Sequence, residues 1–372
     1  MVTEKKRFLQ FHDLEVEIER TASEDVRRLL EDYLLGTEGG LRYRQLDIRE
    51  RLAAIGEIWF MSLRKRGRLL GTVGFVRREL ACDSTRFNSY YVRYFSIRSS
   101  PVRKELKGRN IRTDKQGGRL RTRVEEFMGE AHRYLRGNGR LPSVLYAYIE
   151  KENSASLQMS GRMGYHPVRS MDLTWFSRLS PRRHVAVSPA CEEDKEMIRV
   201  RLRHFYSEHC LFHEEGLFRG GDYYLFRDPS GRVVAGVQTR VVHWQITGMP
   251  GAAGFFFLRL LPRIPRLKRF HDGHGFRFLS LEAVFFEKGW EHALIPLVET
   301  AMADTGMHLA VLWHDTDDPL RRAVRSLRKR GWFAHLIGTP VAEVRMRFLE
   351  TTAEQENAFR QRPVYVAAFD VT

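Results

Sequence analysis

A short glycine-containing segment, Lys115 to Arg119, has residue types suited to binding phosphate. It reads Lys115, Gln116, Gly117, Gly118 and Arg119 and precedes a helical pattern of apolar residues that starts at Leu120. The first turn of a helix carries unpaired N–H groups and a partial positive charge, and these favour a diphosphate. The preceding loop, 99–114, is strongly basic, so it either adds phosphate contacts or forms a solvated loop. Its cations are Arg103, Lys104, Lys107, Arg109 and Arg112.

A second segment whose residue types could take part in binding or catalysis runs from Asn153 to Tyr165, after a predicted strand at 144–149. Asn153 is a favourable helix-capping residue, and the small Ser156 leaves room for a cofactor tail to lie close to the helix. Gly164 suits the left-handed conformation that ends many helices. This spacing of Asn153, Ser156, Gly164 and Tyr165 resembles the late helix of the GNAT acyltransferase superfamily.

The resemblance implies direct transfer of an acyl group from a pantetheine thioester to an amine, with acetyl-CoA or another acyl-CoA as co-substrate and no metal. A backbone N–H of the central strand, here in the region 94–97, is expected to polarise the thioester carbonyl. The segment 115–119 then corresponds to the pyrophosphate loop, although it does not match the family pattern fully. The expected cofactor-binding residues are Phe95, Ser96, Ile97, Gln116, Gly117, Gly118, Arg119, Asn153 and Ser156.

Three residues are candidates for the catalytic groups. Ser160 stands where many family members have a tyrosine that protonates the departing thiolate, and its hydroxyl can still donate a hydrogen bond. A base must take the proton of the attacking amine, directly or through water. Glu79, at the end of a hairpin strand, and Glu150, after the fifth strand, are the candidates for this base.

The order of elements occurs twice along the chain, with a Pro-containing boundary at 180–183. The first cycle comprises strand 15–20, helix 25–34, hairpin strands 55–63 and 69–80, strand 89–97, helix 120–135, strand 144–149, helix 153–163 and strand 168–176. The second comprises strand 184–187, helix 191–206, hairpin strands 223–227 and 233–244, strand 276–286, helix 294–302, strand 308–313, helix 319–330 and strand 341–348. We predict an α/β (mixed α+β) protein with two GNAT-like domains in tandem, 1–180 and 181–372. Each is a mostly antiparallel sheet flanked by helices, and the second carries an insertion at 248–274.

The first copy is the expected cofactor site, because the second departs further from the family pattern. Leu327 occupies the position of the tyrosine in the second copy and cannot donate a proton. The counterpart of the phosphate loop retains Gly289 between Glu287 and Glu291, whose carboxylates repel a diphosphate. The second copy is therefore expected to shape the substrate cleft or to stabilise the pair.

Composition restricts the class of protein and its partners. The 372 residues are 43% hydrophobic and carry a net charge of +16, which indicates a folded protein that attracts anions. No signal peptide or spanning segment is evident, so the expected location is the cytoplasm. The three cysteines, Cys82, Cys191 and Cys210, are few and odd in number, which argues against a disulfide framework and for a reducing compartment.

Several alternatives stay open at this stage. The insertion places the apolar run Phe255 to Leu261 beside cations, which suits domain packing, a membrane surface or an acyl pocket. A long-chain acyltransferase using acyl-CoA or an acidic acyl carrier protein is one rival, and a non-catalytic binding module with the same fold is another. The acceptor is a small-molecule or peptide amine, and the basic run 321–330 makes nucleic acid a less favoured partner. His209 and His213 are spaced as a metal pair, but the rest of such a site is missing.

Overall fold

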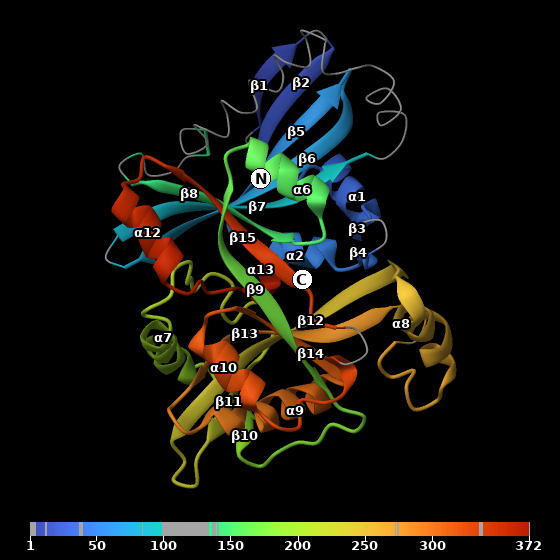
Figure 1. Cartoon of the computed structure of the whole chain (residues 1–372), viewed down its shortest axis with the longest axis vertical. Helices are drawn as coiled ribbons and strands as arrows, with labels where there is room; N and C mark the ends of the chain where they lie inside the picture. Colours follow the sequence, from blue (N-terminus) through green and yellow to red (C-terminus); the bar gives the residue numbers. More distant parts are fainter. Residues whose placement is uncertain are drawn as a thin grey trace.

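The computed structural model describes residues 5–371 except 12, 37–39, 84, 99–133, 136–138, 140, 272, 274 and 335–337. The predicted phosphate segment, with Gln116, Gly117, Gly118 and Arg119, lies outside these described residues. The molecule is elongated, with the first half of the chain at one end and the second half at the other (Figure 1). Strands of both halves belong to one continuous sheet, and helices pack against it.

Among the described residues the elements follow the predicted order, with additional short strands and helices, and most of the predicted helix 120–135 lies outside the described residues. The strands are β1 (Lys5–Phe11), β2 (Leu14–Arg20), β3 (Leu35–Gly36), β4 (Arg42–Gln45), β5 (Ile58–Lys65), β6 (Arg68–Cys82), β7 (Thr85–Ile97), β8 (Ser143–Glu150), β9 (His166–Ser177), β10 (Val187–Pro189), β11 (Tyr223–Arg227), β12 (Val233–Gly248), β13 (Phe276–Phe286), β14 (Leu309–Asp315) and β15 (Val341–Leu349). The helices are α1 (Glu24–Asp32), α2 (Ile48–Ala54), α6 (Ser154–Arg162), α7 (Asp194–Phe205), α8 (Gly251–Phe255), η1 (Phe256–Leu260), η2 (Leu261–Arg263), η3 (Glu291–Ala293), α9 (Leu294–Thr305), α10 (Pro319–Ser326), α12 (Ala353–Gln361) and α13 (Ala368–Val371).

The two halves exchange their final strands. β9 ends the first half but pairs with β14 of the second, whereas β15 ends the second half but pairs with β8 of the first. β9 and β15 also pair with each other at the centre of the molecule, where they lie side by side in green and red (Figure 1). The sheet order β7-β8-β15-β9-β14-β13 is therefore symmetric about this central pair. Each half of the sheet is completed by a strand from the other.

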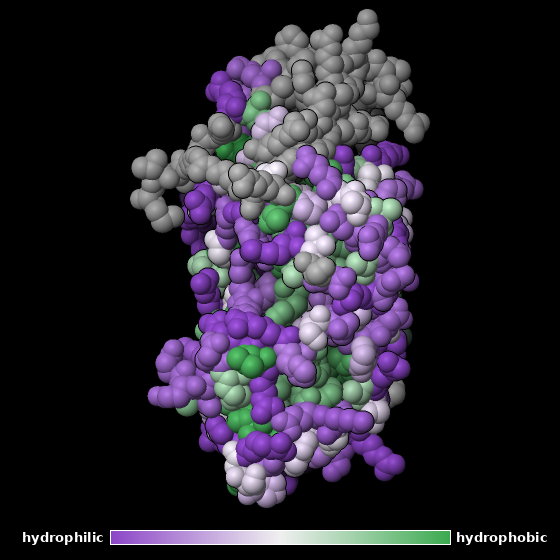
Figure 2. Space-filling view, turned by 90° about the vertical axis from the view of Figure 1, so that its left-hand side faces the viewer, coloured by the Kyte–Doolittle hydropathy of each residue, from purple (hydrophilic) through white to green (hydrophobic). Residues whose placement is uncertain are grey.

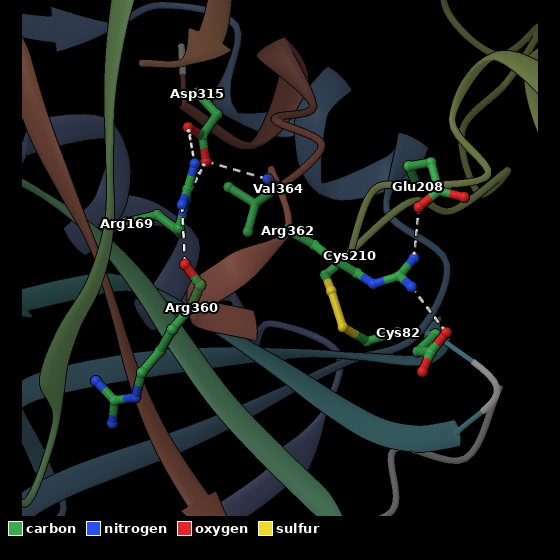
Figure 3. Close-up of a disulfide and its surroundings, with 9 residues drawn as sticks. Cys82, Arg169, Glu208, Cys210, Asp315, Arg360, Arg362 and Val364 are labelled. Atoms are coloured by element: carbon green, nitrogen blue, oxygen red, sulfur yellow. Dashed lines mark hydrogen bonds and ion pairs between the residues drawn. A yellow bond between two sulfur atoms is a disulfide. The ribbon is translucent and has the colours of Figure 1, made fainter. Parts of the chain in front are cut away.

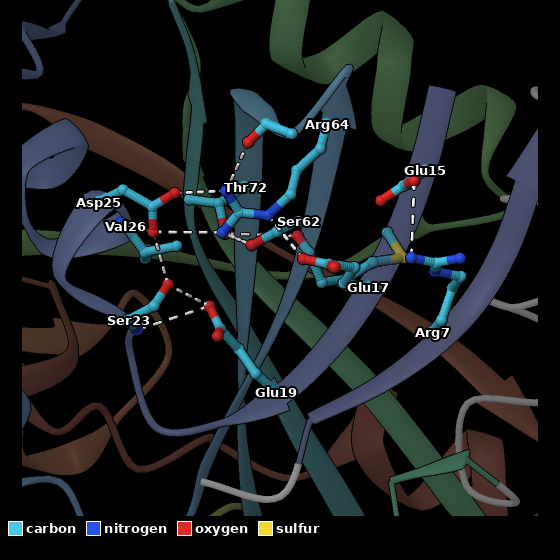
Figure 4. A network of polar contacts seen from close by, with 12 residues as sticks. Arg7, Glu15, Glu17, Glu19, Ser23, Asp25, Val26, Ser62, Arg64 and Thr72 are labelled. Carbon is cyan, nitrogen blue, oxygen red and sulfur yellow. Dashed lines mark hydrogen bonds and ion pairs between the residues drawn. The ribbon is translucent and has the colours of Figure 1, made fainter. Parts of the chain in front are cut away.

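A buried arginine fixes α1 onto the first half of the sheet. Val26, Leu29 and Leu30 form the buried face of α1, at the spacing expected of an amphipathic helix. Arg64 of β5 donates through Nε to Glu17 at 2.6 Å and through its Nη groups to Asp25 in the first turn of α1 (Figure 4). This hydrogen bonding lowers the pKa of Asp25 to about 2, so its carboxylate stays charged at neutral pH.

The face of the molecule that lies on the left in Figure 1 is mostly hydrophilic. Figure 2 shows only small, separated apolar patches among the placed residues of this face. Scattered apolar residues are normal on a protein surface.

The cysteine expectation is corrected by a disulfide between Cys82 and Cys210 (Figure 3). Cys82 ends β6, and Cys210 lies after α7, where it also pairs with Val364 in an isolated bridge. Their Cα atoms are 4.5 Å apart, although 128 residues separate them in the sequence. Counting cysteines could not reveal the pair, because only the tertiary fold brings these two segments together. Cys191 is exposed and free.

We expect one reactive thiol per chain in the denatured protein without reductant, and three after reduction. Closing so long a loop restricts the unfolded chain, so Cys82→Ala is expected to lower the free energy of unfolding by about 2 to 4 kcal/mol. Thiol titration and denaturant unfolding measure the two effects. Cys191→Ala is the matched control and should leave the stability unchanged. Three thiols in the unreduced protein would contradict the bridge.

Candidate active site

Both halves contain a parallel strand pair whose ends diverge. β7 and β8 pair only from Asn88 with Ser143 to Tyr91 with Tyr146, after which each strand continues beside a different neighbour. The register with β6 shifts just beyond this point, where Tyr94 has a φ of 57°. Such a bulge leaves backbone groups outside the regular ladder. We call the diverging ends of β7 and β8 the first divergence point.

The second half repeats this geometry. β13 and β14 pair from Leu279 with Ala310 to Leu281 with Leu312 and then diverge. The register with β12 shifts immediately afterwards, where Ala283 has a φ of 48°. We call this the second divergence point. The repeat of divergence and bulge shows that the two halves share one local architecture.

Aromatic and charged side chains occupy one face of the first divergence point. Tyr91 and Tyr146 are registered partners, and their ring centroids lie 5.2 Å apart, as do those of Tyr91 and Tyr148. Side chains alternate along a strand, so Arg93 follows Tyr91 on this face and Glu150 follows Tyr148. The Arg93 guanidinium lies 4.1 Å from the ring centroid of Tyr94, in cation–π geometry. A carboxylate and a guanidinium therefore flank the diverging strand ends.

The position of Glu150 and its raised pKa suit a proton acceptor. Its side chain is half-buried, and among the described residues its carboxylate has no hydrogen-bond or ion-pair partner. Burial, followed by the nearby charge of Glu152, raises the pKa of Glu150. Burial, followed by the charge of Glu150, raises the pKa of Tyr43. A carboxylate with a raised pKa and no partner is a candidate general base.

Glu79 lies away from this place. It is opposite Asn88, at the end of the β6–β7 pair that is remote from the bulge. Its carboxylate is 3.5 Å from Arg77 and 2.8 Å from Arg86, so it belongs to a surface ion-pair group. The structure therefore brings Glu150, and not Glu79, to the first divergence point.

The α6 segment has the expected local structure. Asn153 Oδ1 accepts a hydrogen bond from the backbone N–H of Ser156 at 3.1 Å, which confirms the predicted cap. Gly164 has a φ of 78°, as predicted for the helix end. The hydroxyl of Ser160 is buried and donates to the carbonyl of Leu157 at 3.0 Å. In this conformation the hydroxyl is engaged within its own helix, and a role for Ser160 as proton donor stays a prediction.

The predicted strand residues at the bulge point in alternating directions. Phe95 and Ile97 are exposed, at 41% and 43%, whereas Ser96 is buried and is the registered partner of Thr72. In the described chain, no side chain is hydrogen-bonded to the amides of Tyr94 or Phe95. This bulge is therefore free of the side-chain hydroxyls that occupy its counterpart.

Tyrosine side chains occupy the bulge at the second divergence point. Ala283 and Val284 give backbone hydrogen bonds to the hydroxyls of Tyr365 and Tyr206, and these bonds partly offset the effect of burial, which raises the pKa of both tyrosines. Tyr223 in turn donates to the carbonyl of Ala283 at 2.7 Å. No local pattern in the sequence indicates these residues, because Tyr206 and Tyr365 lie far from β13 along the chain.

The last described segment, 363–371, runs between the two divergence points. Asp370 in α13 accepts two hydrogen bonds from Arg78, at 2.7 and 2.8 Å, and both side chains are almost fully buried. Tyr91 donates its hydroxyl to the carbonyl of Asp370 at 2.6 Å. Burial would raise the pKa of Asp370, but the charge of Arg78 holds it well below its usual range. This contact joins residues 292 apart in sequence, and no local pattern signals it.

The histidine pair considered in the sequence has separate partners. His209 Nε2 lies 3.1 Å from Asp318, and His213 Nε2 lies 3.9 Å from Asp370. The described residues contain no group of three or more His, Cys, Asp or Glu side chains arranged to hold a metal ion. In the same part of the chain, no helix is long and apolar enough to cross a membrane.

Comparison with solved structures identifies the fold. No protein-family model matches the sequence, and no curated protein matches it. N-myristoyltransferase from Saccharomyces cerevisiae, in a structure with bound myristoyl-CoA, aligns with a TM-score of 0.57 at 10% identity, covering 97% of this chain and 86% of that chain. Another structure of that enzyme with myristoyl-CoA aligns with a TM-score of 0.55 at 10% identity and covers 97% of this chain and 90% of that chain. A third structure, with myristoyl-CoA and inhibitors, aligns with a TM-score of 0.53 at 10% identity and covers 92% of this chain and 81% of that chain.

These alignments extend over nearly the whole chain, so the likeness includes both halves. The predicted fold class, an α/β fold of two similar halves with a mostly antiparallel sheet, is confirmed, and the fold is the one seen in N-myristoyltransferase. At 10% identity the likeness concerns the fold alone. The chemistry must be argued from the residues of this chain.

Proposed function

We propose that this protein is an N-acyltransferase that binds an acyl-CoA at the first divergence point and transfers the acyl group to an amine. The observation that carries the proposal is Glu150, a half-buried carboxylate that has no hydrogen-bond or ion-pair partner among the described residues and lies on β8, the strand that diverges from the bulged strand β7. The equivalent bulge in the second half is filled by tyrosines. In this proposal residues 1–180 carry the cofactor site, and residues 181–372 complete it through β15 and shape the acceptor side.

The chain's own groups supply each step of a direct transfer. A backbone N–H at the Tyr94 bulge polarises the thioester carbonyl, and the acceptor amine attacks that carbon. Glu150 takes the proton of the amine, directly or through water, while the C–S bond breaks and the thiolate leaves. The leaving sulfur then takes up a proton, for which Ser160 stays the candidate donor if its hydroxyl rotates away from Leu157.

Acyl chain length separates two versions of this function. Acetyl-CoA is the co-substrate that the GNAT resemblance favours. A long-chain acyl group, from acyl-CoA or an acidic acyl carrier protein, is the second candidate, because the aligned yeast structures contain myristoyl-CoA. Mass spectrometry of the acylated product distinguishes the two directly. We place the reaction in the cytoplasm, where acyl-CoA thioesters are available.

Binding tests the site without knowledge of the acceptor. We expect calorimetry to show binding of acetyl-CoA or myristoyl-CoA, and Ser156→Trp to weaken it about tenfold or more, equivalent to at least about 1.4 kcal/mol. The indole would fill the space that a small residue leaves for the pantetheine tail. Gln158→Trp, at an exposed position of the same helix, is the matched control and should bind normally. If neither thioester binds the unmodified protein, the chain is better described as a non-catalytic module with this fold.

A further inference from the structure

A lobe formed by residues 251–269 projects from the body of the second half. It connects β12 to β13 and comprises α8, η1, η2 and the turns that follow, drawn in gold at the right of Figure 1. Phe257 and Leu261 are completely buried, and Phe257 packs against Phe276 and Phe333 with ring centroids 5.4 and 6.0 Å apart. The base of the lobe is thus part of the hydrophobic core, which holds its outer surface in a defined position.

The outer surface of the lobe carries large apolar side chains. Phe255 is 61% exposed, Leu260 41% and Ile264 39%. Arg259 and Arg263 lie between these apolar residues in the sequence and are exposed as well. Exposed apolar residues that gather on one projecting element indicate an interaction site more strongly than single scattered ones do.

The same lobe is exclusively cationic. Residues 249–271 contain no Asp or Glu. Its five cations are all exposed, and in the described part of the chain none of them forms an ion pair: Arg259, Arg263, Arg266, Lys268 and Arg269. Elsewhere exposed arginines commonly have acidic partners, as Arg49 has in Glu24 and Arg203 in Glu214. The cations of the lobe are therefore available to bind an anion from outside the described chain.

We propose that this lobe docks on the surface of an anionic lipid bilayer. Phe255, Leu260 and Ile264 would enter the headgroup boundary, and the surrounding cations would contact lipid phosphates. Nucleic acid fits less well, because it offers no apolar layer for Phe255 and Leu260. The inference does not depend on the proposed acyl transfer.

Sedimentation of the full chain with vesicles tests the proposal. We expect the protein to bind phosphatidylcholine vesicles that contain about 30% phosphatidylglycerol and to bind pure phosphatidylcholine vesicles much less, since the basic residues respond to anionic lipid. Binding should weaken as the salt concentration is raised, because salt screens the attraction between the basic residues and the anionic lipids. A protein that stays in the supernatant with the anionic vesicles at low salt would overturn the proposal.

Paired substitutions locate the binding surface. Arg263→Gln with Arg266→Gln should lower the partition coefficient about 30-fold, which corresponds to about 1 kcal/mol for each basic residue removed. Phe255→Ser should lower it about tenfold through the loss of apolar contact. The matched control, Arg68→Gln with Arg182→Gln, removes two other exposed arginines and should have little effect. Equal losses in the control and the lobe variant, or tighter binding to DNA or an acidic protein than to the vesicles, would refute lipid docking by this lobe.

Discussion

Glu150→Gln is expected to lower kcat/KM for acyl transfer by about 10²- to 10⁴-fold, the usual contribution of a general base. The amide is nearly isosteric with the carboxyl group but cannot accept the proton of the amine. Because Glu150 has no partner among the described residues, its replacement breaks no ion pair and should leave the stability unchanged. Glu79→Gln, which alters a surface ion-pair group, is the matched control and should retain activity.

The pH dependence gives this prediction a second readout. Burial and Glu152 raise the pKa of Glu150 above its ordinary value, so the active carboxylate forms only as the pH rises through that higher pKa. The wild-type rate should therefore increase with pH on an acidic limb, and this limb should be absent in the residual activity of Glu150→Gln. Glu152→Gln should move the limb to lower pH. A full rate with an unchanged acidic limb in Glu150→Gln would exclude this base.

Arg78→Met is expected to destabilise the fold by about 3 to 5 kcal/mol, because it leaves the buried carboxylate of Asp370 without its counter-charge. The side chains of Arg78 and Asp370 are only 4% and 1% exposed, so water cannot replace the lost hydrogen bonds. Urea unfolding measures the change. Arg86→Met, which removes an exposed ion pair with Glu79, is the control and should cost less than about 1 kcal/mol.

The sign of the pH effect follows from the lowered pKa of Asp370. A carboxylate with a folded-state pKa below its unfolded value stabilises the protein above the unfolded pKa, and this contribution is lost as the pH falls towards the folded pKa. The stability deficit of Asp370→Asn should therefore be full at neutral pH and narrow in acid. An Arg78→Met, Asp370→Leu double variant should recover much of the stability, since neither charge is left buried. A deficit of the double variant equal to the sum of the two single ones would show that the residues are not coupled.

Local signals predicted the local features. The side-chain preferences of Asn153 and Gly164 specify a cap and a left-handed residue, and both occur where the spacing placed them. The spacing of apolar residues similarly predicted most of the strands and helices in their order along the chain. Glu79 and Glu150 look alike in sequence, each a carboxylate near a strand end. Only their surroundings distinguish them, since Arg77 and Arg86 surround one and the other has no partner.

Features that depend on distant contacts were not predictable. The pattern of β15 shows that it is a strand but does not reveal that its neighbours are β8 and β9. The same holds for the bond between Cys82 and Cys210 and for the hydroxyl of Tyr365 at Ala283. In each case the partner is chosen by the tertiary fold, and residue type alone carries no information about it.

The exchange of final strands has a consequence for biosynthesis. While the ribosome is still translating the second half, β8 has a bare edge, because Val341–Leu349 does not yet exist to cover it. Asp370, which anchors the interior beside Tyr91, emerges later still. A nascent chain therefore cannot assemble its first-half site early, and prematurely terminated products would expose an unsatisfied sheet edge that invites aggregation or degradation.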